Sequence, residues 1–144
     1  MSSNTANHAG SSNKIWKQIF MVIILLQALF ELAIGFTLLF DLPMAMANFN
    51  TPYSSDMEVL GLTLGLYLFL LTTLMVLSFV WVRKSNAAGI TLGIIIGIFL
   101  MSFGVGMLIK FGETQAIFVD GLRGGLTMFL AYMAGKAIKH KKLI

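Results

Sequence analysis

Four long apolar runs account for most of the chain, and short polar segments separate them. The runs cover residues 15–40, 59–82, 87–109 and 116–138. Each exceeds the ~20 residues that an α-helix needs to cross a hydrocarbon core about 30 Å thick. A closed β-barrel would instead need segments of about ten residues with alternating hydrophobicity. The pattern therefore predicts an all-α, polytopic membrane four-helix bundle.

Polar residues at the ends of the runs predict where the helices begin. Ser55 and Glu58 have the spacing of an N-terminal capping box. Asn86 and Thr114 are N-cap residue types ahead of the third and fourth runs. Both prolines of the chain lie in residues 41–58, which favours a connection there. We therefore expect Glu58 to serve first as a helix-start residue.

The segments outside the runs predict one domain with two short tails. Residues 1–13 are rich in Ser and Asn and are predicted as a flexible N-terminal tail. Residues 14–139 form the single transmembrane domain, and residues 140–144 form a basic C-terminal tail. A signal peptide is an alternative for the first run, because Ala45-Met46-Ala47 resembles a cleavage site. The length of this run and its internal Glu31 favour a retained helix.

Charge patterning predicts the orientation in the membrane. Hydrophobic residues make up 58% of the chain and charged residues 11%, which indicates lipid as the solvent. Basic residues are unequally divided between the two sides of the membrane. One side carries only Lys110 and Arg123, whereas the other carries Lys14, Lys17, Arg83, Lys84, Lys136, Lys139, Lys141 and Lys142. Basic flanks stay on the cytoplasmic side, so both termini are predicted in the cytoplasm. Trp16 and Trp81 would share that interface. We expect a multi-pass protein of the cell membrane, in the style of a bacterial inner membrane.

Several classes of chemistry are excluded by residue type. The chain has no Cys, so thiol catalysis, disulfides and iron–sulfur ligation are absent. Its two histidines, His8 and His140, lie in the predicted tails, so no metal site or bound cofactor is predicted. The net charge of +4 is concentrated at helix ends and does not indicate nucleic-acid binding. The expected partners are the lipid bilayer, a lipophilic small molecule and a membrane-protein partner or second copy.

Glycines recur at helical spacing on three of the runs. Small residues four apart let helix backbones approach closely, which supports association where lipid removes the hydrophobic drive. We therefore predict helix-packing seams. The glycines concerned are Gly61, Gly65, Gly89, Gly93, Gly97, Gly121 and Gly125, with Gly124 beside the last two.

Ionisable residues inside two of the runs are the main functional clue. Glu31 lies near the middle of the first run, and Asp120 and Arg123 lie early in the last run. A charge near the bilayer centre costs about 2.5–3.5 kcal/mol on insertion scales, so it normally faces a partner, water or a ligand. These residues are the leading candidates for a ligand-binding or proton-carrying site.

Helical depth predicts which polar residues meet. At ~1.5 Å per residue, Glu31 lies roughly 13 Å from the outer end of its helix, and Tyr67 reaches a similar depth on the second helix. Arg123 lies nearer the outer face, and its long side chain spans part of the difference. Further candidates are Gln27, one turn from Glu31, and Thr63, one turn from Tyr67.

Two pairings stay open for these charges. In one, Asp120 neutralises Arg123 at the i, i+3 spacing and Glu31 is protonated. In the other, Glu31 and Arg123 form an interhelical pair and Asp120 faces an outer vestibule. The second leaves fewer unpaired charges and is favoured. An ion pair that only fixes helix register is the structural alternative to a ligand site.

The ligand hypothesis is a small, mainly apolar pocket that opens outward from the bundle. There the carboxylate and guanidinium would orient a lipophilic molecule with a polar head, such as a quinone. A carboxylate, a tyrosine and an arginine can position a substrate or move a proton, but they do not define a reaction. We therefore predict no catalytic activity for the chain on its own.

The overall plan also points to a known group. The chain places four helices in 144 residues, has a longer first outer connection with prolines, and opens the second helix with Glu58-x-x-Gly61-x-x-x-Gly65. Over residues 15–138 this plan resembles the DoxX-like group of small bacterial membrane proteins. The resemblance implies a four-helix bundle of often unassigned role, with some relatives associated with quinone-linked oxidation of sulfur compounds. The Asp120-x-x-Arg123 pair is not matched to that group.

Two further hypotheses come from other functional classes. Small multidrug transporters also have four helices and a glutamate in the first, so a proton-coupled exporter could use Glu31. The long connection over residues 41–58 and the positive-inside bias count against it, because such antiparallel dimers insert in both orientations. The third hypothesis is an accessory subunit whose glycine seams and Glu31 dock on a larger membrane complex.

Overall fold

Four long helices dominate the structure, a computed structural model that describes residues 3–48, 52–112 and 114–140. Side chains are described for residues 14–47, 52–112, 114–136 and 138. The long helices are α1 (Ser3–Phe40), α3 (Glu58–Arg83), α4 (Ala87–Phe111) and α6 (Leu122–His140). The described part of the chain contains no strand. The predicted all-α class is therefore confirmed.

Each long helix contains, or continues, a segment that can cross a membrane. These segments are long enough and apolar enough by composition, which makes the chain a multi-pass membrane protein. They span Lys14–Phe40, Ser55–Arg83, Ala87–Phe111 and Thr114–Lys136.

Shorter elements lie at the connections. They are α2 (Leu42–Asn48), the 3₁₀ turn η1 (Ser55–Met57), α5 (Thr114–Ala116) and the π-helical segment η2 (Ile117–Gly121). The sequence predicted only a connection where α2 lies. It also predicted a flexible tail before residue 14, whereas α1 begins at Ser3.

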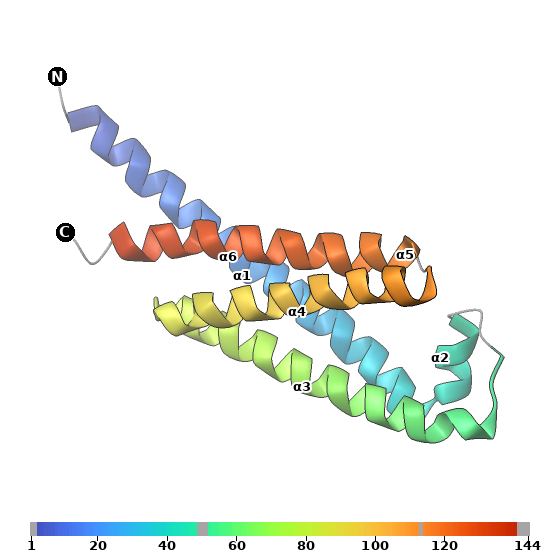
Figure 1. Cartoon of the computed structure of the whole chain (residues 1–144). Coiled ribbons are helices and arrows are strands. Elements are labelled where there is room, and N and C mark those ends of the chain that lie inside the picture. Colours follow the sequence, from blue (N-terminus) through green and yellow to red (C-terminus); the bar gives the residue numbers. More distant parts are fainter. Residues whose placement is uncertain (1–2, 49–51, 113, 141–144) are drawn as a thin grey trace.

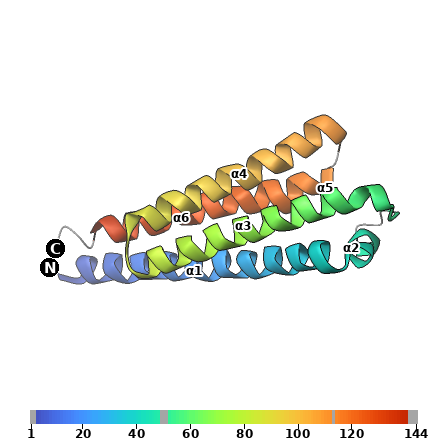
Figure 2. The ribbon, with the colours of Figure 1, turned by 90° about the horizontal axis from the view of Figure 1, so that it is seen from below.

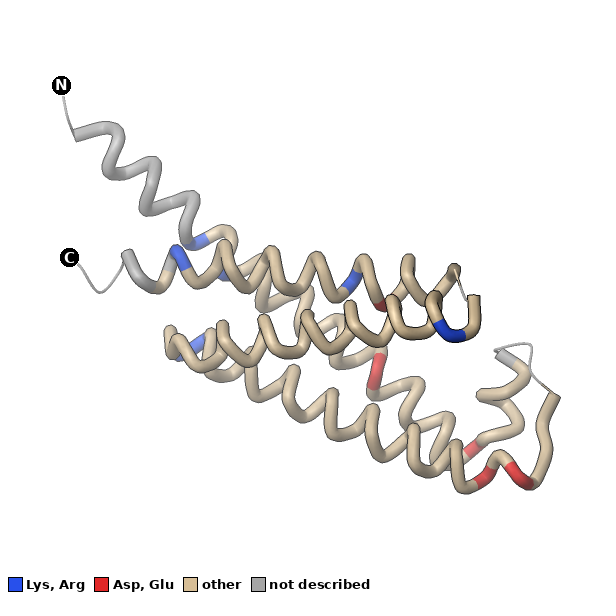
Figure 3. Tube along the Cα trace, in the orientation of Figure 1, with Lys and Arg blue, Asp and Glu red and all other residues tan. Residues whose placement is uncertain are grey.

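The four long helices form a closed ring. α1 packs against α3 and α6, and α4 packs against the same two helices. Both chain termini lie at one end of the bundle, called here the terminal end, and α2 lies at the opposite, distal end (Figures 1 and 2). Most Lys and Arg positions of the described trace lie toward the terminal end, and most Asp and Glu positions toward the distal end (Figure 3). This arrangement agrees with the predicted placement of the termini on one side.

The main hydrophobic core occupies the terminal half of the bundle and joins all four long helices. Its α1 members run from Phe20 to Ala28, and Met75 of α3 and Ile96 of α4 are almost fully buried. Its last α4 member is Leu100, and its first α6 member is Leu130. The common core therefore ends about halfway along the bundle.

The distal half is held differently. A second cluster of buried residues, Leu38, Leu42 and Ala45, joins α1 and α2 and packs against Met57 of η1 and Leu68 of α3. On the other side, α4 packs against η2 and α6. The two pairs of helices diverge toward the distal end (Figure 1). The distal half thus consists of two separately packed layers.

A side chain caps the start of α4 but not the start of α3. Asn86 caps α4 as predicted, because its side chain accepts a hydrogen bond from the Ala88 N–H at 2.9 Å. The capping box predicted at Ser55 is wrong: Met57 is the N-cap of α3, and no side chain caps it. Glu58 instead accepts a hydrogen bond from the Tyr53 hydroxyl at 2.8 Å. The Glu58 carboxylate therefore accepts from the exposed Tyr53 hydroxyl and not from the backbone N–H of Ser55, as a capping box would require.

Glycines bring α4 and α6 into backbone contact. A Cβ built on Gly124 would lie 2.5 Å from the carbonyl oxygen of Gly97 and from the Met101 nitrogen. A Cβ on Gly104 would lie 2.6 Å from the nitrogen of Gly121. Because backbone atoms cannot move aside as a flexible side chain can, this interface, the glycine seam, requires residues without a Cβ.

The remaining glycines play unequal parts. Gly61 and Gly65 of α3 pack against leucines of α2 and α1, whereas Gly93 packs against Phe20. Gly89 lies against the backbone of α3, across the hairpin. The prediction for Gly125 is wrong, because a Cβ there would meet nothing within 4 Å.

Candidate functional site

The ionisable residues of the last span lie around the π-helical segment. Asp120 belongs to η2, and Arg123 follows in the first turn of α6. The backbone of this segment is pressed against Gly104 of α4, at Ala116 and Gly121. Short π segments often occur at functional sites, because the extra residue in the turn redirects the side chains around it. Here Arg123 reaches Glu31 of α1, and Asp120 contacts the Arg123 guanidinium.

Arg123 lies between two carboxylates. It forms an ion pair with Glu31 of α1 across the helix interface, and its guanidinium Nη2 lies 3.3 Å from Asp120 Oδ1. Glu31 is only 4% exposed, although its position is inside a membrane span. The favoured pairing between Glu31 and Arg123 is therefore present. Asp120 does not face away as that arrangement assumed, because it contacts the same guanidinium.

One of the five guanidinium donors of Arg123 is both buried and unused. This donor, on Nε, has no hydrogen-bond partner among the described residues. The ring of Phe30, centred 5.4 Å from Arg123 Cζ, covers one side of the group in a cation–π contact. Phe30 itself is about half exposed. Sequence reasoning missed this aromatic neighbour, although its position directly before Glu31 could have suggested it.

A second polar contact between α1 and α6 lies one turn deeper. The Thr127 hydroxyl is 3.0 Å from Gln27 Oε1 and 2.8 Å from the carbonyl oxygen of Arg123, so its single hydrogen serves two acceptors. Both side chains are buried. Gln27 is at the centre of the Lys14–Phe40 span, which places this contact near the middle of the membrane. Thr127 was absent from the predicted site.

Two predicted members of the site lie elsewhere. Tyr67 is 38% exposed and packs its ring against Phe99 of α4, with ring centroids 5.5 Å apart. Thr63 is exposed, and its hydroxyl donates to the Val59 carbonyl of its own helix. Depth along α3 was estimated from sequence, but depth does not say which way a side chain points around the helix.

The charged cluster, Glu31, Asp120 and Arg123, lies just past the end of the common core. On α1 it falls between Ala28, which belongs to the main core, and Leu38, which belongs to the distal cluster. On α6, Arg123 precedes Leu130, the first α6 residue of the main core. The charges therefore lie where the two layers of the distal half begin to separate.

The arrangement has more negative than positive groups. Two carboxylates contact one guanidinium, so full ionisation would leave one uncompensated negative charge inside a membrane span. Such a charge is costly in lipid and is normally neutralised by a proton, a cation or a polar ligand. The cluster can accordingly hold one proton, donate a hydrogen bond from Arg123 Nε, and orient a polar group.

The described part of the chain holds a further groove but no cluster of metal-ligand side chains. No group of three or more His, Asp or Glu side chains there could hold a metal ion. A groove of about 470 Å³ lies between α4 and α6, lined by α4 residues from Ile98 to Ile109 and by Met128. None of the three charged residues lines it, so it is separate from the cluster.

Tyr53 lies outside the membrane spans and contacts Glu58, near the distal start of the Ser55–Arg83 span. The hydrogen bond from Tyr53 to Glu58, and the negative charge of that carboxylate, raise the pKa of Tyr53 above its usual value of 10.0. The contact is fully exposed and lies apart from the charged cluster in the membrane.

Comparison with protein-family models, with curated proteins and with solved structures finds no match to this chain. The functional argument therefore rests on the geometry of the cluster.

Proposed function

We propose that this multi-pass membrane protein binds a lipophilic molecule with a hydrogen-bond-accepting head, such as a quinone, at the charged cluster. The observation that carries the proposal is the buried Arg123 Nε, a donor with no partner among the described residues. A buried donor without an acceptor costs about 1–3 kcal/mol, and a ligand carbonyl would recover that cost.

The surroundings of Arg123 suit an amphiphilic ligand. The half-exposed ring of Phe30 offers an apolar surface beside the guanidinium, and the parting of the two distal layers begins at this depth. A protonated carboxyl of Glu31 or Asp120 could donate to a second ligand oxygen. The lipid tail of such a molecule would stay in the bilayer.

The broader setting is part of the same proposal. The resemblance of the chain to the DoxX-like group, with its quinone-linked relatives, supports a quinone rather than another lipophilic head. The positive-inside bias supports termini in the cytoplasm of a bacterial inner membrane. The charged cluster would then lie in the outer half of that membrane.

The test is a binding measurement with a short-chain, water-soluble quinone. Calorimetric titration of the purified protein in detergent should show one saturable site. Arg123→Lys keeps the positive charge but removes the Nε–H and the planar fork. We expect its Kd to rise at least tenfold, because a hydrogen bond to a charged group contributes about 1.5–3 kcal/mol.

The matched control is Arg83→Lys, the same change at the exposed arginine of the terminal end. This variant should bind the quinone as the wild type does. Circular dichroism of both variants verifies that they fold. No saturable binding by the folded wild type, or equal affinity in Arg123→Lys, would exclude the proposed function.

Proton-coupled export is a second candidate, favoured by the surplus carboxylate of the cluster. An exporter could exchange one proton for one lipophilic cation at Glu31 and Asp120. In vesicles, an imposed pH gradient should then drive uptake of such a cation, and Asp120→Asn should abolish the uptake. Gradient-independent quinone binding without transport would favour the first candidate.

A further inference from the structure

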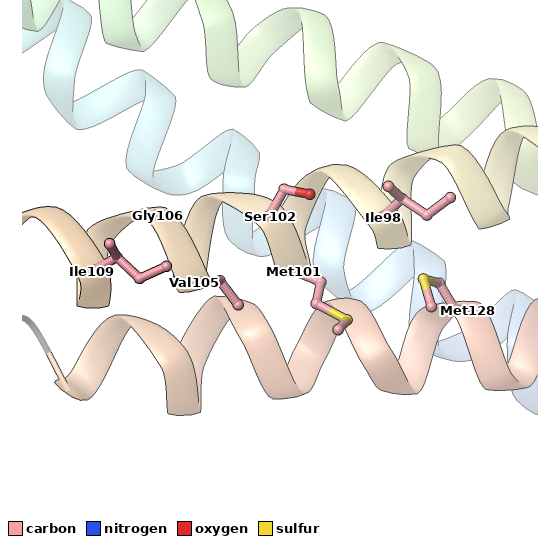
Figure 4. A pocket seen from close by; sticks show the side chains of 7 residues that line it. All are labelled: Ile98, Met101, Ser102, Val105, Gly106, Ile109 and Met128. Carbon is pink, nitrogen blue, oxygen red and sulfur yellow. The ribbon is translucent and has the colours of Figure 1, made fainter.

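A groove on the surface of the bundle is unrelated to the charged cluster. This α4–α6 groove has a volume of about 470 Å³ and is almost entirely apolar. Met101 and Val105 extend from α4 toward α6, and Met128 extends from α6 toward α4 (Figure 4). Its volume falls in the range of about 300–1,000 Å³ that is typical of ligand pockets.

The groove is open because small residues form part of it. Gly106 lines its distal part, and a Cβ built there would meet no atom within 4 Å. Ser102, one turn before it, is exposed. Ile98 and Ile109, at the two ends of the groove, are 51% and 80% exposed. Because this part of α4 lies within a membrane span, the open side of the groove faces lipid.

A cation stands at the distal mouth of the groove. Ile98, Ser102 and Gly106 follow one another at the i, i+4 spacing of a single helix row, and the next position in this row is Lys110. Lys110 is exposed and forms no ion pair with any described residue. Its ammonium lies 5.6 Å from the centre of the Phe111 ring. The apolar floor of the groove therefore leads directly to a positive charge.

The length of the groove matches one leaflet of a bilayer. From Ile98 to Ile109 it extends roughly 16 Å at ~1.5 Å per residue, about half of the ~30 Å hydrocarbon core. Ile98 lies near the middle of the Ala87–Phe111 span, and Lys110 lies near its distal end. An occupant would thus reach from the bilayer centre to the interface.

We propose that the α4–α6 groove binds one acyl chain of an anionic phospholipid whose phosphate is held by Lys110. Charge complementarity selects the head group, and groove length selects a chain of one leaflet. The other described charges at the distal end, on Asp41, Asp56 and Glu58, are negative. An anionic head group would therefore be drawn to Lys110 and away from the rest of that end.

Native mass spectrometry of the full chain, released from detergent, tests the proposal. The probes are dioleoylphosphatidylglycerol and dioleoylphosphatidylcholine, which share the same chains and differ in charge. We expect the first phosphatidylglycerol to bind more tightly than the first phosphatidylcholine. Lys110→Gln should weaken phosphatidylglycerol binding about fivefold, which corresponds to about 1 kcal/mol per basic residue near an anionic lipid. It should leave phosphatidylcholine binding unchanged.

A second variant tests the groove itself. Gly106→Leu fills open space without a clash and should weaken binding of both lipids. The controls are Lys84→Gln, an exposed lysine at the terminal end, and Ala33→Leu, an exposed small residue of α1 in the distal half. Both controls should bind lipid as the wild type does.

Three results would overturn the proposal. The first is equal affinity for the two lipids in the wild type. The second is unchanged binding by Gly106→Leu, which would reduce the Lys110 effect to surface attraction. The third is a disulfide-linked dimer of Ser102→Cys in membranes, because the chain has no native Cys and such a link would place a second copy over the groove.

Discussion

Helix α6 meets its two neighbours in opposite ways. Toward α4 it presents glycines, and Gly124 approaches the α4 backbone so closely that a single methyl group would collide. Toward α1 it presents Arg123 and Thr127, which meet buried polar side chains. Both interfaces lie in the membrane, where burial of apolar surface does not drive helices together.

The two interfaces of α6 suggest two different roles, one in stability and one in function. Close backbone packing at the glycine seam gains dispersion energy with no desolvation cost, so it needs no further explanation. The charged cluster on the other face places three ionisable groups where each is expensive, and a buried pair rarely adds net stability against an apolar replacement. We infer that the polar face is maintained for a ligand or proton.

The largest expected loss of stability comes from a substitution on the polar face of α6, which contacts α1. Arg123→Gln leaves two carboxylates inside the membrane without a cation and should lower the free energy of unfolding by about 3–5 kcal/mol at neutral pH. Unfolding by sodium dodecyl sulfate in mixed micelles, followed by circular dichroism, measures the change. The triple variant Glu31→Gln, Asp120→Asn, Arg123→Gln removes all three charges and should recover most of the loss.

That recovery separates the two roles of the cluster. A triple variant as stable as the wild type, but unable to bind the quinone, would show that the charges serve ligand binding. If the triple variant stays as unstable as Arg123→Gln, the cluster is structural, and the contrast between the two faces of α6 disappears.

The next largest loss of stability is expected from a substitution in the glycine seam between α4 and α6. Gly124→Ala forces a methyl group against backbone atoms of Gly97 and Met101 and should lower the free energy of unfolding by about 1–3 kcal/mol. Gly125→Ala is the matched control at the adjacent residue, where a Cβ meets nothing. It should be neutral or slightly stabilising, because Ala favours helix by up to about 1 kcal/mol over Gly. Equal losses in the two variants would show that α4 and α6 do not depend on the seam.

These residues also show what sequence could predict. The four spans follow from local run length and hydropathy, and the meeting of Glu31 with Arg123 follows from depth and charge. Depth does not fix direction around a helix, so Tyr67 was wrongly placed with them. Gly125 was likewise grouped with Gly124, although one residue is a rotation of about 100°.

Two elements escaped prediction for different reasons. The sequence does signal α2: Asp41 accepts a hydrogen bond from the Met44 N–H at 3.1 Å, and Pro43 lies in the first turn, where it has no N–H to leave unpaired. The two prolines of residues 41–58 instead favoured a connection, although Pro43 is compatible with the first turn of a helix. The π-helical segment has no comparable local signal, and it lies against Gly104 of α4, far away in the sequence.

A smaller loss of stability is expected from the uncharged polar contact between α1 and α6. Thr127→Val keeps the shape of the side chain and removes the hydroxyl that donates a hydrogen bond to Gln27 Oε1. We expect a loss of about 0.6 kcal/mol in the free energy of unfolding, the average for interhelical hydrogen bonds in membranes. Ser102→Ala, an exposed hydroxyl of α4, is the control and should change nothing. A loss above that of Gly124→Ala would mean that polar contacts, rather than glycine packing, hold α6 in place.

The smallest effect concerns an exposed polar contact at the distal edge of a membrane span. The raised pKa of Tyr53 means that its bond to Glu58 favours the protonated phenol in the folded state. Any stabilisation is therefore present below the usual pKa of 10.0 and is lost as pH rises through the higher folded value. Tyr53→Phe should leave the unfolding midpoint at neutral pH unchanged, because exposed contacts contribute little. Absorbance titration of tyrosinate should show one group titrating at lower pH in Glu58→Gln than in the wild type. If Tyr53→Phe instead destabilises the protein as much as Thr127→Val, burial in the membrane is not what gives the polar face of α6 its strength.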